Sequence, residues 1–70
     1  MLKSRVVEML RTQAEAERQK ALLSLELLMN VPVGIGDHST GDFYKNAEEA
    51  LQMLVDAEDK LETLNKYFSE

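Results

Sequence analysis

The middle of the chain reads Asn30-Val31-Pro32-Val33-Gly34-Ile35-Gly36-Asp37-His38-Ser39-Thr40-Gly41-Asp42. This stretch holds the only proline and all three glycines of the sequence, so the residues that interrupt helices are confined to it. The segments on either side consist mostly of good helix formers. The sequence therefore predicts a first helix at about 2–29, a loop at about 30–40 and a second helix at about 41–68.

The second predicted helix has a regular apolar pattern. Its apolar residues alternate between spacings of four and three, which is the a/d pattern of a coiled coil. The series is Phe43, Ala47, Ala50, Leu54, Ala57, Leu61, Leu64 and Phe68. Tyr44, Leu51 and Val55 widen this stripe on one flank, which is typical of a helix that touches more than one neighbour. Lys60 follows Asp56 by four residues, so we expect these two side chains to pair along the helix.

The first predicted helix carries two alternative stripes with the same heptad spacing. One runs through Val7, Leu10, Ala14, Glu17, Ala21, Ser24 and Leu28. The other runs through Leu2, Val6, Met9, Gln13, Ala16, Lys20, Leu23 and Leu27. Each includes two polar residues, and the residues alone leave open which stripe faces the second helix. The segment 22–29 is apolar almost all round, which indicates that further helices pack there.

Two helices of similar length joined by a short loop predict an all-α antiparallel hairpin, forming a single domain over residues 1–70. Residues 1–35 sum to a charge of +1 and residues 36–70 to −6, which favours their lying side by side. A chain of 70 residues without disulfides usually needs a partner to complete its core, so we expect a homo-oligomeric helical bundle. The expected oligomer interface consists of Leu22, Leu25, Leu28, Leu51, Leu54, Val55, Leu61 and Leu64.

Composition and charge exclude several classes of function. The chain has no cysteine and one histidine, so a disulfide, a cysteine zinc site and a multi-histidine metal site are not expected. A net charge of −5 without a basic stripe disfavours binding to nucleic acid. No apolar run approaches the roughly 20 residues of a membrane span, and neither polar face is basic enough for a membrane surface. We expect no cofactor, no membrane contact and a cytoplasmic location.

The loop is the candidate binding site, formed by Gly34, Gly36, Asp37, His38, Ser39 and Thr40. One interpretation is structural: the glycines allow a tight backbone, and Ser39 or Asp42 caps the second helix. Another is an anion or nucleotide site, because glycine-flanked amides beside a helix N-terminus can cradle phosphate. A divalent metal site at Asp37, His38 and Asp42 is disfavoured by the single imidazole. Consecutive Asp37, His38 and Ser39 cannot readily form a nucleophilic relay, so we expect no enzyme activity.

The loop also carries a resemblance. The stretch from Asn30 to Ser39, with the segments 57–62 and 66–68 of the acidic second helix, resembles short proteins of tailed bacteriophages that have a Pro-Val-Gly-Ile-Gly-Asp-His-type loop. The resemblance covers about half of the chain and implies a viral accessory protein acting in the host cytoplasm. Our leading hypothesis is a non-enzymatic helical interaction protein that binds a host or viral protein. The alternative is an oligomeric sponge that sequesters a small anionic ligand, such as a nucleotide immune signal.

Overall fold

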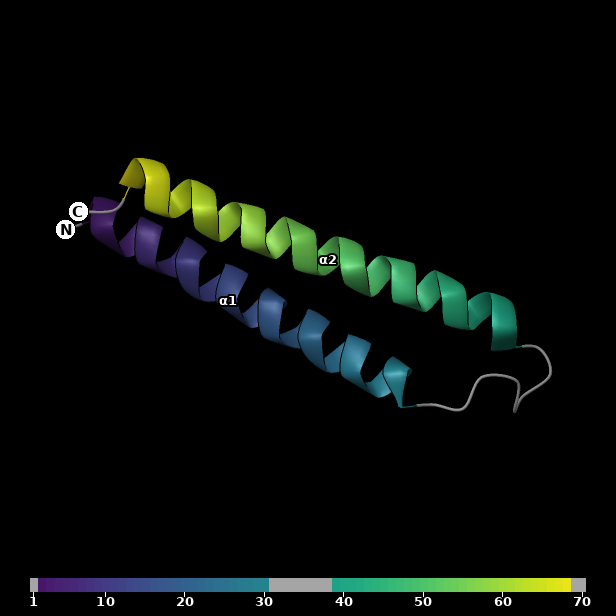
Figure 1. Cartoon of the computed structure of the whole chain (residues 1–70). Coiled ribbons are helices and arrows are strands. Elements are labelled where there is room, and N and C mark those ends of the chain that lie inside the picture. The colour runs from purple at the N-terminus through teal and green to yellow at the C-terminus, as the bar shows by residue number, and fades with distance from the viewer. Residues whose placement is uncertain (1, 31–38, 69–70) are drawn as a thin grey trace.

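The computed structural model describes residues 2–30 and 39–68 of the chain. Helix α1 spans Leu2–Met29 and helix α2 spans Ser39–Phe68, and the two lie side by side in opposite directions (Figure 1). The molecule is a narrow rod with extents of 53 × 15 × 15 Å. No strand occurs among the described residues, so the predicted all-helical hairpin is confirmed. Helix α2 begins two residues before the predicted position, a difference that is common at helix ends.

Asn30 ends helix α1. Its backbone N–H donates a hydrogen bond to the carbonyl oxygen of Leu27 at 3.2 Å, and its side-chain Nδ2 donates to the carbonyl oxygen of Glu26 at 2.8 Å. The last carbonyl groups of a helix have no partner within the helix itself. Asn30 therefore satisfies two of these acceptors, which explains why α1 stops at Met29 before Pro32.

Helix α2 has charges that suit its dipole at both ends. Asp42 lies in the first turn and Lys66 lies in the last turn. Negative charge near a helix N-terminus and positive charge near its C-terminus are each stabilising by about 0.3–1 kcal/mol at an exposed site. The two ends of α2 are thus favoured by local electrostatics as well as by the contact with α1.

The core of the hairpin is built mainly from small side chains. The buried residues of the described part are Ala14, Ala21, Ala50, Ala57 and Leu64, and Ala21 and Ala57 are both 0% exposed. The alanines within each helix are seven residues apart, so they form a line of small residues along each contact face. Phe43, Ala47, Leu54 and Leu61 are partly buried on the same face of α2, which confirms its predicted heptad series as far as Leu64. Phe68, the last residue of that series, is 46% exposed, because it lies in the last turn of the helix.

Helix α1 uses only one of its two heptad stripes to contact α2. The inner seam, as we call it, is the first stripe, in which only Leu10 is exposed, at 41%; its members are Val7, Leu10, Ala14, Glu17, Ala21, Ser24 and Leu28. Arg11, Arg18 and Leu25 are partly buried beside it. The second stripe is not buried against α2, and its large apolar residues are exposed: Val6 by 51%, Met9 by 55%, Leu23 by 58% and Leu27 by 68%. We call the described part of this second stripe, with Gln13, Ala16 and Lys20 between those residues, the outer stripe.

Candidate functional site

Most of the loop predicted as a binding site lies outside the described residues. This applies to Gly34, Gly36, Asp37 and His38. The backbone of Ser39 and Thr40 belongs to the first turn of α2, and their side chains also lie outside the described part. The candidate surfaces that the structure does describe are therefore on the sides of the two helices.

The structure divides the predicted oligomer interface into two groups. Leu25, Leu28, Leu54 and Leu61 are half-buried between α1 and α2, and Leu64 is buried there at 7% exposure. These five residues stabilise the hairpin itself. The other three residues are exposed at the surface and are Leu22, Leu51 and Val55.

The three exposed residues gather on one edge of the hairpin, which we call the side patch. Arg18 Nε lies 3.6 Å from Glu58 Oε2, and this ion pair bridges the two helices along that edge. Leu22 lies one turn after Arg18 on α1, and Val55 lies one turn before Glu58 on α2. Because the helices run in opposite directions, these two side chains follow the ion pair on the same side toward the loop. Leu51 extends the patch by one further turn.

The opposite edge of the hairpin is polar and acidic. Lys60 Nζ lies 3.2 Å from Glu17 Oε1 and donates a hydrogen bond to it. The sequence had suggested that Lys60 pairs with Asp56 on its own helix, but in the structure Lys60 pairs with Glu17 on the other helix. Asp56 instead accepts a hydrogen bond from Gln52 Nε2 at 3.0 Å. A groove of about 340 Å³ beside this pair is lined by Leu10, Gln13, Ala14, Glu17, Asp59, Lys60, Thr63 and Leu64.

The charges around this groove do not suit an anionic ligand. Glu17 and Asp59 contribute two carboxylates, and the ammonium group of Lys60 is already bound to Glu17. A neighbouring groove, lined by Glu17, Glu49, Gln52, Met53, Asp56 and Lys60, is more acidic still. An anion placed on this edge would meet net negative charge, so its described residues lend no support to phosphate binding.

The outer stripe is the surface that the predicted interface omitted. The sequence contained its signal, since its spacing repeats that of the inner seam along the whole of α1. In the structure its large residues are exposed along α1, and Gln13 and Leu27 also reach the grooves that border α2. The described part of the chain thus exposes two apolar surfaces, the side patch and the outer stripe.

Within residues 2–30 and 39–68, no group of three or more histidine, aspartate or glutamate side chains is arranged to hold a metal ion. In the same ranges, neither helix is long and apolar enough to cross a membrane.

No family model matches the chain, and comparisons with curated proteins and with solved structures give no match. The surface of the hairpin consists of large exposed apolar side chains on two sides and an acidic edge on a third. Surfaces of this kind bind other proteins by excluding water from apolar side chains.

Proposed function

We propose that the chain is a non-enzymatic interaction protein that assembles with copies of itself and binds a host or viral protein. The observation that carries this proposal is that the core consists mainly of small side chains, whereas large apolar side chains lie on the surface. Four of the five buried residues in the described part are alanine, whereas twelve large apolar or aromatic side chains are 39–78% exposed. A small protein rarely leaves so much large apolar surface uncovered unless a partner covers it.

The energetics of the hairpin support the same proposal. Burial of apolar surface contributes about 25 cal/mol for each Å², and alanine has little surface to bury. Chains of fewer than about 70–80 residues rarely reach more than a few kcal/mol from one core without disulfides or a metal. Covering the exposed leucines in an assembly adds the burial that the alanine core does not supply. Self-association therefore stabilises the fold as well as creating a larger binding surface.

The resemblance of the loop and the second helix to short tailed-bacteriophage proteins adds a biological setting to the proposal. We place the protein in the cytoplasm of an infected bacterium, where it acts as an accessory factor. In that setting, the side patch is the surface that we assign to the protein partner. Its leucine and valine side chains lie next to the Arg18–Glu58 ion pair, so a partner helix would meet an apolar centre with a charged border.

The assembly is tested by light scattering and thermal unfolding over a range of protein concentrations. We expect a mass that is a multiple of 8.0 kDa and a melting temperature that rises with concentration. A mass of 8.0 kDa and a constant melting temperature at all concentrations would contradict the assembly.

The protein partner is tested by capture from a bacterial lysate with two matched variants. The double variant Leu51→Glu/Val55→Glu places charge in the side patch, and Lys45→Glu changes charge on an exposed residue outside it. We expect a captured protein to be lost with the first variant and retained with the second. Equal capture by both variants would refute the side patch as the binding surface.

The alternative function is tested by thermal unfolding with nucleotides. A nucleotide that raises the melting temperature of the parent but not of His38→Ala would support an oligomeric sponge for a small anionic ligand in place of the proposed interaction protein.

A further inference from the structure

The outer stripe of α1 has a spacing that is symmetric about its own centre. Its residues are Val6, Met9, Gln13, Ala16, Lys20, Leu23 and Leu27. The centre lies between residues 14 and 15. Three pairs of residues lie at equal distances on either side of it: Val6 and Leu23, Met9 and Lys20, and Gln13 and Ala16. Val6 is thus matched by another aliphatic residue, Leu23, whereas Met9 is matched by Lys20 and Gln13 by Ala16. Any heptad series has this symmetry of spacing, so the spacing permits an antiparallel pairing of two copies and the charges select the direction.

We propose that the outer stripe binds the outer stripe of a second copy, with the two α1 helices antiparallel. This inference rests on the proposed self-assembly and specifies its surface and geometry. In this arrangement Val6 packs against the partner's Leu23. The stripe from Val6 to Leu27 extends over about three heptads, which is the lower end of what a sustained coiled-coil contact needs. The two α2 helices lie on the outside of the dimer.

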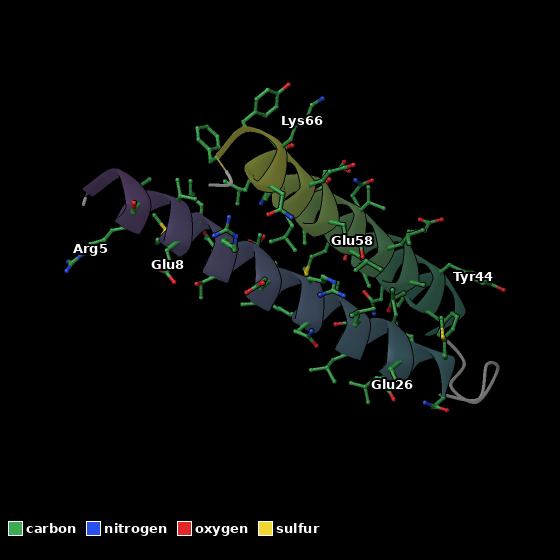
Figure 2. The ribbon with its side chains drawn as sticks, turned by 60° about the vertical axis from the view of Figure 1, so that its left-hand side comes forward. Arg5, Glu8, Glu26, Tyr44, Glu58 and Lys66 are labelled. Carbon is green, nitrogen blue, oxygen red and sulfur yellow. The ribbon has the colours of Figure 1, made fainter. Side chains whose placement is uncertain are left out.

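Charge complementarity supports the antiparallel direction. Arg5 and Glu26 flank the outer stripe on the same side, three heptads apart, and both are exposed. Figure 2 shows both side chains projecting from the side of α1 turned away from α2. When two copies meet antiparallel, Arg5 comes next to the partner's Glu26 at each end of the dimer. The two-fold symmetry produces this pair of opposite charges twice.

The parallel direction lacks this complementarity. Parallel packing in register would place Lys20 against the partner's Lys20 within the contact layer, where like charges repel. It would also place Arg5 beside the partner's Leu10 instead of a carboxylate. In the antiparallel dimer, Lys20 lies over the partner's Met9 and its ammonium group can reach water at the edge. The charged and polar residues of the stripe therefore select one direction.

The surface is tested with two variants of similar initial exposure. Leu23 on the outer stripe is 58% exposed and Leu51 in the side patch is 54% exposed, so a charge at either position is tolerated by the isolated hairpin. In the dimer, Leu23→Glu buries two unpaired carboxylates, and we expect the dissociation constant of the dimer to increase by about 100-fold or more. We expect Leu51→Glu to dimerise as the parent does. Circular dichroism checks that both variants keep their helical content.

The direction is tested by exchanging charges. Arg5→Glu and Glu26→Arg each place like charges together at both ends of the antiparallel dimer. We expect each single variant to weaken dimerisation by about fivefold at low salt, which is a typical magnitude for exposed ion pairs. The double variant Arg5→Glu/Glu26→Arg restores the opposite charges, so its dimer affinity is expected to return close to that of the parent. High salt is expected to reduce all three differences.

Cross-linking gives an independent measure of the direction, because the natural chain has no cysteine. A chain with Val6→Cys is mixed with a chain with Leu23→Cys under oxidising conditions. The antiparallel dimer predicts a disulfide between the two different chains. Val6→Cys alone is expected to cross-link poorly, because its two copies are separated by roughly 25 Å along the helix axis.

The outcomes distinguish this inference from the proposed function. Dissociation by Leu23→Glu together with the mixed cross-link supports the antiparallel α1 dimer. If the parent assembles but Leu23→Glu does not disturb it, the outer stripe is not the interface and self-assembly still stands. Efficient cross-linking of Val6→Cys with itself would show a parallel dimer and overturn the direction. A parent that remains monomeric at every concentration would refute both proposals.

Discussion

The inner seam and the outer stripe lie on the same helix and repeat with the same period, yet only the inner seam faces α2. The inner seam contains the small residues Ala14 and Ala21, whereas the outer stripe contains Leu23 and Leu27. Alanine on α1 matches alanine on α2, because small side chains on both helices allow the backbones to approach closely. The comparison shows that the fit between two surfaces, rather than the hydrophobicity of one of them, selects the face that a helix buries.

The two stripes also differ in what they leave for assembly. Burying the outer stripe against α2 would have placed Met9, Leu23 and Leu27 inside, together with the polar Gln13 and Lys20, and left Ala14 and Ala21 exposed. The observed choice reserves the larger side chains for the outside. A modest core inside the hairpin and a larger apolar surface outside it are thus two consequences of the same packing.

The largest effect is expected from filling the inner seam. Ala21 is fully buried and Ala16 is exposed on the outer stripe of the same helix. Ala21→Leu inserts a large side chain at a fully buried position of the contact between the helices, and we expect a loss of about 1–3 kcal/mol in the free energy of unfolding. The same change at Ala16 leaves the monomeric hairpin as stable as the parent. Urea unfolding followed by circular dichroism at low protein concentration measures both, and equal losses would contradict the assignment of the two stripes.

A smaller effect is expected from truncating the apolar series of α2. Leu54 is half-buried between the helices, whereas Leu51, three residues earlier, is 54% exposed. Leu54→Ala is expected to cost about 2 kcal/mol, near the lower end for leucine truncation because the site is only partly buried. Leu51→Ala is expected to cost less than about 0.5 kcal/mol in the monomer. If Leu51→Ala lowered the free energy of unfolding more than Leu54→Ala, the assignment of the contact face of α2 would be wrong.

The smallest effects are expected from the two interhelical ion pairs. Arg18 and Glu58 are 41% and 57% exposed at their side chains, so solvent screens their attraction. A double-mutant cycle with Arg18→Gln and Glu58→Gln is expected to give a coupling of about 0.2–1 kcal/mol that decreases with salt. A corresponding cycle for Lys60 and Glu17 is expected to give a similar value. A coupling free energy well above this range at either ion pair would show that these pairs contribute substantially to the stability of the hairpin.

The sequence by itself determined the helices and where they end. The proline and glycines are confined to one stretch, so two uninterrupted helices and a hairpin follow from local preferences alone. The contact face of α2 was also predictable, because its apolar residues form a single heptad series from Phe43 to Leu61 that the structure buries. The residues proposed for the loop site, such as His38, lie outside the described part of the chain, so their role stays a prediction.

The tertiary structure decided which stripe of α1 becomes the inner seam. Both stripes have the same spacing and each includes polar residues, so periodicity could not separate them. The choice depends on the shape of the partner helix, where Ala50 and Ala57 form a line of small residues that only Ala14 and Ala21 can match closely. The same packing brought Lys60 to Glu17 on the other helix instead of to Asp56 on its own. Such pairings arise between residues far apart in the sequence, and local preferences contain no information about them.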